Sequence, residues 1–203
     1  MRILLGLLTL CLASPAFAAK PVYPTLSEAE GEKLADGKLV LRKSGDGDDS
    51  GSVVGIQRIN ATEAAVWRLL LSFERIPESN DAVVIAEDYT AEMSRTPPSG
   101  CRYVDVHYQL EVVGQTVLYN IHHTYYPAQR YLDWTLDDQK ENDIDSTVGS
   151  FSTWPVEGHA DQIDFLYTTR VDTGRSVPEW VETLLTRTSL KGYFKFVKKE
   201  AER

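Results

Sequence analysis

Four histidines are the residues of this sequence best suited to metal binding or to acid–base chemistry near neutral pH: His107, His122, His123 and His159. His122 and His123 are adjacent in a segment that alternates like a strand, so their side chains point to opposite faces and cannot readily hold one ion. No two histidines are two apart on a strand or four apart on a helix, the spacings that bring two metal ligands together. We therefore predict no metal site and no cofactor.

An acidic segment, DGDDSG at residues 46–51, matches the first half of a calcium-binding loop. It has oxygen-bearing side chains at the first, third and fifth positions of the pattern and glycine at the sixth. Gln57 stands where such a loop needs a bidentate glutamate, and residues 53–59 alternate like a strand. We interpret this segment as a flexible acidic turn.

The sequence lacks the motifs of common hydrolases and nucleotide-binding enzymes. The nucleophile pattern G-x-S-x-G, the zinc motif H-E-x-x-H and a phosphate-binding glycine loop are all missing. Acid–base chemistry by Tyr108, His123 or Tyr167 inside an apolar cavity is the enzymatic alternative. We expect a binding protein rather than an enzyme, and we assign no catalytic residue.

Residues 1–19 have the organisation of a secretory signal peptide. Arg2 supplies a positive start, residues 3–12 are apolar, and Ala16-Phe17-Ala18 is a small-x-small cleavage motif. The apolar run is too short to span a bilayer. We expect cleavage after Ala18 or Ala19, which makes the mature protein periplasmic or secreted.

The two cysteines, Cys11 and Cys101, do not form a pair in the mature chain, because Cys11 leaves with the signal peptide. A lipoprotein signal at Cys11 is an alternative, but the bulky Leu10 before it departs from that pattern. No base can be assigned to Cys101, and we interpret it as structural. Export without an internal disulfide is typical of a bacterial envelope protein.

The formal net charge of the 203-residue chain is −9, and it becomes one unit more negative when Arg2 is removed. This balance argues against a nucleic-acid partner, since phosphate binding needs clustered Lys and Arg. It also argues against simple attraction to anionic lipid surfaces. Roughly 185 residues remain after cleavage, which suits one domain with a sizeable core, and we expect a monomer.

The N-terminal half of the mature chain reads as two short helices and two strands. Ser27 and Glu30 predict a capping box at the start of a helix that Gly37 ends, and Asn60 and Glu63 predict a second one. Between them, residues 38–43 and 52–59 read as strands. The second helix has an apolar stripe and ends at Pro77; the stripe is Val66, Leu69, Leu70 and Phe73.

The C-terminal half contains segments whose apolar residues alternate with polar ones, as in antiparallel strands with one wet face. The predicted inner faces combine aliphatic residues with a few polar groups, which is typical of a ligand pocket. Two further strands are predicted at residues 81–89 and 148–157. The pattern of the second does not indicate which of its faces is buried. The alternating sets are Val104, Val106, Tyr108, Leu110 and Val112; Val117, Tyr119, Ile121, His123 and Tyr125; Leu132, Trp134 and Leu136; and Ile163, Phe165, Tyr167, Thr169 and Val171.

Two segments resemble signatures of the START, birch-pollen-allergen and polyketide-cyclase superfamily. The first, residues 59–78, carries Val66, Trp67, Phe73 and Pro77; the second, residues 171–190, carries Gly174, Pro178 and Trp180. The resemblance implies an α+β helix-grip fold, in which a curved antiparallel sheet of about seven strands wraps a long C-terminal helix. It assigns residues 52–203 to this domain and residues 20–51 to an N-terminal extension with a short helix and a strand.

Proteins of this superfamily bind lipids, sterols, quinones or polyketides, and some catalyse cyclisation. The resemblance therefore implies an internal cavity for a hydrophobic small molecule or lipid, which the protein would carry across the periplasm with transient membrane contact. A polyketide cyclase or dehydratase and a ligand-free structural domain are the alternatives. The expected ligand contacts are Val106, Tyr108, Leu110, Tyr119, Ile121, His123, Trp134, Phe165, Tyr167, Thr169, Val181, Leu184, Leu185 and Thr188.

The long C-terminal helix, called the closing helix below, carries two apolar stripes. They lie on nearly opposite sides of the helix at 100° per residue. The first, which should roof the cavity, is Val177, Trp180, Val181, Leu184, Leu185 and Thr188; the second is Leu190, Tyr193, Phe194, Val197 and Ala201. The helix must therefore bend between Ser189 and Gly192, or bury its second stripe against another part of the chain.

Overall fold

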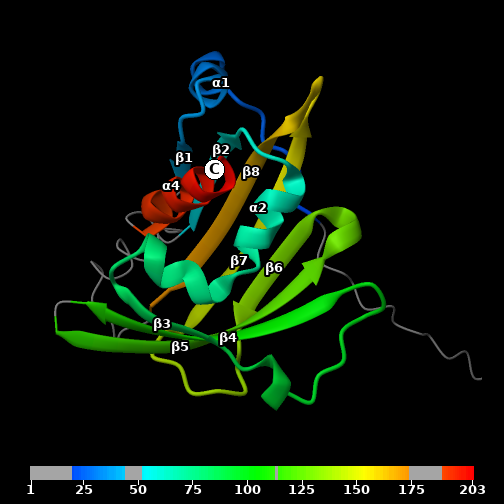
Figure 1. Ribbon diagram of the computed structural model, residues 1–203. Coiled ribbons are helices and arrows are strands. Elements are labelled where there is room, and N and C mark those ends of the chain that lie inside the picture. The colour runs from blue at the N-terminus through cyan, green and yellow to red at the C-terminus, as the bar shows by residue number, and fades with distance from the viewer. Residues whose placement is uncertain (1–19, 44–51, 113, 174–188) are drawn as a thin grey trace, which may run out of the picture.

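The computed structural model describes residues 20–43, 52–112, 114–173 and 189–203. It has an α+β fold in which one antiparallel sheet curves around helices on its inner face (Figure 1). The predicted signal peptide, the acidic turn and the first stripe of the closing helix lie outside the described residues, so those interpretations stay predictions.

The sheet contains eight strands, one more than the approximate number predicted, in the order β1-β2-β8-β7-β6-β5-β4-β3. The strands from β3 to β8 form a meander, and β2 and then β1 continue the sheet beyond β8. The two edges are therefore β1 and β3. The strands are β1 (Val40–Lys43), β2 (Ser52–Ile59), β3 (Val83–Asp88), β4 (Arg102–Val112), β5 (Gln115–Tyr126), β6 (Tyr131–Leu136), β7 (Ser146–Val156) and β8 (His159–Asp172).

Two helices cover the inner face of the sheet, and a third lies at its β1–β2 end (Figure 1). The inner helices contact each other, and α4 also contacts η1. No helix in the described part of the chain is long and apolar enough to cross a membrane. The α-helices are α1 (Glu28–Ala35), α2 (Glu63–Leu70) and α4 (Ser189–Ala201), and the 3-10 helices are η1 (Phe73–Ser79), η2 (Thr90–Glu92) and η3 (Pro127–Gln129).

The N-terminal extension is built into the same sheet. The capping box predicted for α1 is confirmed, since Glu30 Oε2 accepts a hydrogen bond from the Ser27 backbone N–H at 2.9 Å. Gly37 follows the helix with a φ of 67°, a left-handed conformation that favours glycine. β1 then pairs with β2, so the extension supplies an edge strand to the sheet.

The capping box predicted for α2 is wrong. Its N-cap is Thr62, whose side chain accepts a hydrogen bond from the Ala65 backbone N–H at 3.3 Å. Glu63 instead accepts from Thr153 Oγ1 at 2.6 Å and pairs with Arg130 Nε at 3.0 Å. The helix ends at Leu70, and Pro77 lies within η1 rather than at the helix end.

The alternation predicted for the inner face is confirmed along β4 and β5. Val106 and Leu110 are fully buried, and Tyr108 is 5% exposed. In the β4–β5 ladder Tyr108 lies directly opposite Tyr119 and Val104 lies opposite His123. The sheet therefore presents rows of apolar and aromatic side chains to the helices.

The second apolar stripe of the closing helix is buried in the core. Leu190, Phe194 and Val197 are at most 2% exposed. Gly192 lies inside α4, and a Cβ there would come within 2.4 Å of the Ser79 carbonyl oxygen. Gly192 therefore permits close packing of α4 on η1, and the helix is continuous through it.

Candidate functional site

The inner face of the sheet encloses a cavity of about 110 Å³ between β4–β8 and η1. Its wall is mostly aromatic and aliphatic, with His123 and two threonines as polar members. Such a wall is typical of a small-molecule site. The described residues that line it are Phe73, Tyr108, Tyr119, Ile121, His123, Trp134, Ile144, Thr147, Phe151, Tyr167, Thr169 and Val171.

A second cavity, also about 110 Å³, lies beside the first and reaches α4. It shares three tyrosines with the first cavity: Tyr108, Tyr119 and Tyr167. The helix contributes Ser189, Leu190 and Tyr193 to this wall. The other described residues that line it are Ile76, Ser79, Asn80, Val83 and Leu110.

Most of the predicted ligand contacts among the described residues border these cavities: Tyr108, Leu110, Tyr119, Ile121, His123, Trp134, Tyr167 and Thr169. Val106 and Phe165 do not line either cavity; both are fully buried in the core. Phe165 packs against Phe194 of α4, with ring centroids 4.9 Å apart. The other four predicted contacts, Val181, Leu184, Leu185 and Thr188, lie outside the described residues. Ligand contact by any of these residues stays a prediction.

Strand β7 supplies two cavity residues that the sequence analysis did not assign, Thr147 and Phe151. Both share a strand face with Gly149, which interrupts the apolar pattern. A Cβ at Gly149 would come within 2.2 Å of the Trp134 indole, so glycine lets this ring lie across β7. A sequence signal for the inner face of β7 was present in the two-residue spacing of Thr147, Gly149 and Phe151. It becomes clear only if Gly149 is taken as an inner position where a neighbouring side chain leaves no room for a Cβ.

His123 is held in one orientation in the wall of the first cavity. It is 3% exposed, and its Nδ1 lies 2.8 Å from the Val104 carbonyl oxygen. Because a carbonyl can only accept, Nδ1 carries the proton and Nε2 is left as an acceptor. Burial lowers the pKa of His123 to about 3, so the ring is uncharged at neutral pH.

Four tyrosines gather around the two cavities: Tyr108, Tyr119, Tyr167 and Tyr193. Burial raises the pKa of each, so all four hydroxyls stay protonated at neutral pH. These hydroxyls can donate and accept hydrogen bonds in the cavity walls.

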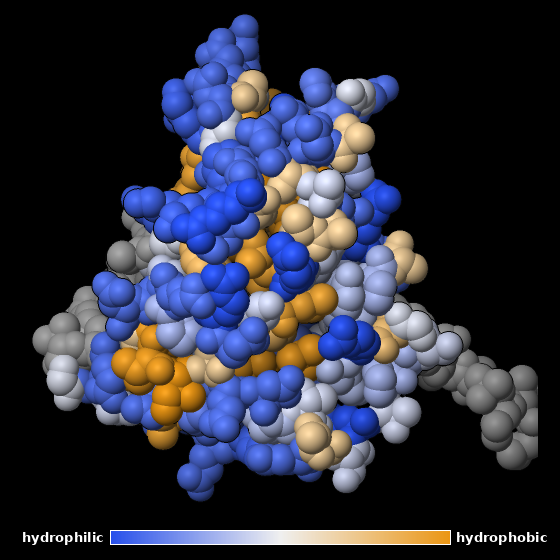
Figure 2. All heavy atoms as spheres, viewed as in Figure 1, coloured by the Kyte–Doolittle hydropathy of each residue, from blue (hydrophilic) through white to orange (hydrophobic). Residues whose placement is uncertain are grey.

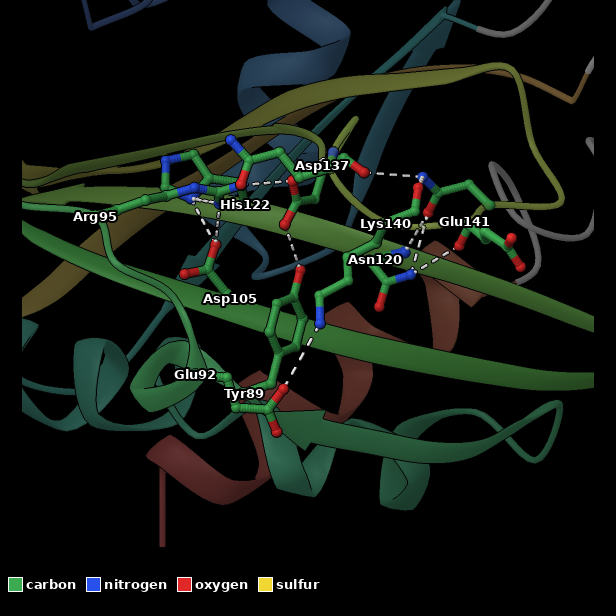
Figure 3. A network of polar contacts seen from close by, with 11 residues as sticks. Tyr89, Glu92, Arg95, Asp105, Asn120, His122, Asp137, Lys140 and Glu141 are labelled. Carbon is green, nitrogen blue, oxygen red and sulfur yellow. Dashed lines mark hydrogen bonds and ion pairs between the residues drawn. The ribbon is translucent and has the colours of Figure 1, made fainter.

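The outer face of the sheet carries a polar cluster that sequence reasoning missed (Figure 3). Arg95 binds two buried carboxylates, Asp105 Oδ1 at 2.7 Å and Asp137 Oδ1. His122 Nδ1 also lies 2.6 Å from Asp105 Oδ1, and the Tyr89 hydroxyl donates to Asp137 Oδ2 at 2.7 Å. The prediction that His122 and His123 face opposite sides of the sheet is confirmed.

Asp105 alternates with the inner residues of β4, a pattern that predicts a solvent-exposed outer position, but its side chain is fully buried. The chain after β3 folds over the outer face: the Tyr89 N–H donates to the Asp105 carbonyl, and Thr90 Oγ1 accepts from the Asp105 N–H. This segment also carries Arg95, and it has no periodic pattern from which its position could be predicted.

The outer cluster has a structural role and lies on the opposite face of the sheet from the cavities. Burial acts to raise the pKa of Asp137, but hydrogen bonds from Arg95 and Tyr89 outweigh it and lower that pKa. One guanidinium thus pairs with two buried carboxylates. No group of three or more metal-ligating side chains occurs in the described ranges.

No family model matches the sequence, and no curated protein matches it. The structure does resemble solved proteins. A STAR-related lipid transfer protein fragment from Xanthomonas axonopodis aligns with a TM-score of 0.59 at 16% identity, covering 81% of this chain and 99% of that one. An aromatase/cyclase from Streptomyces aligns with a TM-score of 0.57 at 15% identity, covering 81% and 95%.

A third protein, a START superfamily member from Mycobacterium smegmatis, aligns with a TM-score of 0.55 at 20% identity, covering 74% of this chain and 97% of that one. At sequence identities of 20% or less, this structural similarity shows a shared fold. The chain therefore has the helix-grip fold shared by START-related proteins and polyketide aromatase/cyclases. The resemblance seen in the two sequence segments is confirmed at this level.

Proposed function

We propose that this protein binds a hydrophobic small molecule or lipid in the two adjoining cavities. The observation that carries the proposal is the wall itself, which is largely aromatic and aliphatic and includes the uncharged hydroxyls of Tyr108, Tyr119 and Tyr167. An apolar ligand gains roughly 25 cal/mol for each Å² removed from water. Burying about 200 Å² would therefore give about 5 kcal/mol, which corresponds to sub-millimolar binding.

The titration behaviour of the cavity favours binding over catalysis. General acid–base groups work best when their pKa lies near the working pH. His123 has its pKa lowered to about 3, and burial raises the pKa of Tyr108 and Tyr167. These groups are therefore a weak base and weak acids at neutral pH. The cyclase or dehydratase alternative would need a ligand that shifts these pKa values toward neutrality.

From the predicted signal peptide we propose that this binding activity lies outside the cytoplasm, in the periplasm or in the medium. There an apolar compound needs shelter from water, and a monomeric carrier with an enclosed site would supply it. Two structurally similar proteins, a lipid transfer protein and an aromatase/cyclase, are consistent with a hydrophobic ligand.

Transient contact with a membrane would let the carrier load or unload its ligand. The support is the outer face of α4, whose side chains are strongly hydrophilic in Figure 2. Lys191, Lys195 and Lys199 are exposed there at four-residue spacing, with no ion-pair partner among the described residues. They border a groove of about 320 Å³ that also contains Leu39 and Phe194. Three exposed lysines thus lie along one side of α4 in a protein whose formal net charge is −9.

Native mass spectrometry of protein purified from its own host tests the binding proposal. We expect an apolar compound to co-purify at up to one molecule per chain and to be released by organic extraction. Protein that carries no such compound, and that also fails to bind added hydrophobic probes, would contradict the proposal. Turnover of an added polyketide-like compound would favour the enzymatic alternative instead.

A further inference from the structure

Three tyrosines form the boundary between the two cavities. Tyr108, Tyr119 and Tyr167 are the described residues common to both walls. Tyr108 and Tyr119 are paired across the β4–β5 ladder, and their rings stack with centroids 5.2 Å apart and planes 22° apart. Tyr167 lies beside Tyr193 of α4, with ring centroids 6.4 Å apart.

The two sides of this boundary differ in their polar groups. The first cavity has His123, whose Nε2 is an acceptor with no donor among the described residues. The second has Ser79, Asn80 and Ser189 near the start of α4. A ligand with one hydroxyl on a ring can therefore direct its donor to His123 in the first cavity.

Volume limits what each compartment can hold. Each cavity measures about 110 Å³, whereas an apolar cavity of about 150 Å³ accepts benzene. Each compartment is smaller than that cavity and therefore holds at most one ring-sized group. A rigid molecule with two or more fused rings would have to displace the stacked pair of Tyr108 and Tyr119.

We propose that Tyr108, Tyr119 and Tyr167 divide the site into two single-ring compartments and thereby set its ligand class. The ligands are compounds whose rigid part is a single ring bearing a hydrogen-bond donor, with any remainder slender enough to pass the tyrosines. Fused polycyclic compounds are excluded. This inference rests on the proposed function and adds to it the residues that determine ligand size.

The test uses full-length mature protein and three rigid probes of increasing width: phenol, 2-naphthol and 9-phenanthrol. Affinities are measured by calorimetric titration. For the wild type we expect phenol to bind and the three-ring probe to bind at least tenfold more weakly. Y119A joins the compartments, so the three-ring probe should gain at least tenfold. Y119F keeps the ring and should keep the wild-type order.

Tyr103 provides a matched control, because it precedes Tyr108 on the same strand but belongs to the outer face. Y103A should leave the order of the probes unchanged. If Y119A does not fold, as judged by its thermal transition, Y119L opens the same wall with less loss of apolar volume and is measured instead. A folded Y119A or Y119L variant that keeps the wild-type order would overturn the proposal.

The experiments distinguish a failure of the proposed binding function from a failure of the two-compartment inference. A wild-type protein that carries a co-purified apolar compound but prefers 9-phenanthrol over phenol would retain the binding function and overturn the partition. A wild-type protein that carries no such compound and binds none of the three probes would overturn both. Two results together support both: wild-type protein that binds phenol at least tenfold more tightly than 9-phenanthrol, and a Y119A variant that gains at least tenfold in affinity for 9-phenanthrol.

Discussion

The imidazole of His123 in β5 donates its Nδ1–H to the carbonyl of Val104 in β4, at 2.8 Å. This bond joins a cavity side chain to the backbone of the neighbouring strand and turns an ionisable residue into a fixed, neutral acceptor. The Phe73 ring packs against the imidazole, with centroids 4.3 Å apart. Three elements therefore determine the position of the one basic nitrogen in the first cavity.

Replacement of His123 by leucine should weaken phenol binding about fivefold to tenfold, because one neutral hydrogen bond contributes roughly 1 kcal/mol. H122L is the matched control, since His122 is the next residue in β5 and faces Asp105 on the outer side. Its phenol affinity should stay within twofold of the wild type. A larger loss of affinity in H122L than in H123L would contradict the orientation of β5.

His123 should also make folding stability depend on pH. Burial lowers its folded-state pKa to about 3 from its ordinary value of 6.5, so the unfolded chain binds the proton first as the pH falls. Its contribution is fully present above pH 6.5 and is lost as the pH falls toward 3. The loss should amount to several kcal/mol, since each pKa unit corresponds to about 1.4 kcal/mol.

Denaturant unfolding of the wild type and H123L between pH 3 and pH 7.5 measures this contribution. The comparison is needed because Asp133 acts in the opposite direction: burial raises its pKa from 3.8 to about 6, which favours the folded state as the pH falls through 6. Both proteins share that effect, and it cancels in the difference. Equal pH profiles for the two proteins would show that His123 titrates normally.

The alternation of β4 and β5 was enough to predict which of their residues lie on the inner face of the sheet, because a strand with one buried face permits a single register. The outer cluster could not be predicted in this way. Arg95 reaches Asp105 from an irregular segment, and nothing in local spacing connects the two. Pairing of this kind depends on tertiary structure alone.

A capping motif predicted from local sequence was wrong where one of its residues binds side chains from distant segments instead. Asn60 and Glu63 have the spacing of a capping box, but Glu63 binds Arg130 and Thr153, and Thr62 caps the helix. Of the two alternatives for the second stripe of the closing helix, the structure shows burial: Leu190, Phe194 and Val197 lie in the core, and Gly192 lets α4 pack closely on the Ser79 carbonyl. The error at the start of α2 comes from contacts between segments far apart in the sequence.

Substitution of Arg95 by methionine should destabilise the fold by about 3–5 kcal/mol, because it leaves the buried Asp105 and Asp137 without their shared counter-charge. Chemical denaturation measures the loss. The double variant R95M/D105N should recover part of it. Phenol affinity of the folded R95M protein should be unchanged, since the cluster lies on the outer face. A loss below about 1 kcal/mol would show that the ion pairs contribute little.

Substitution of Gly192 by alanine should destabilise the protein by at least about 1 kcal/mol, because the new Cβ would meet the Ser79 carbonyl oxygen at 2.4 Å. Gly31 is the matched control, as it lies inside α1 with no atom near its missing Cβ. G31A should stabilise by roughly 0.5–1 kcal/mol through helix propensity. Thermal unfolding of both variants distinguishes them, and a stabilised G192A would show that α4 does not press on η1.

The central claim is that the adjoining cavities are the ligand site, and filling one of them tests it most directly. Thr169 lines the first cavity and is 5% exposed, so T169W would place an indole in that space. Calorimetric titration with phenol is the measurement, on protein whose thermal transition shows that it is folded. We predict that the wild type binds one phenol per chain in this cavity and that T169W loses at least tenfold in affinity. Unchanged phenol affinity in folded T169W would contradict the account.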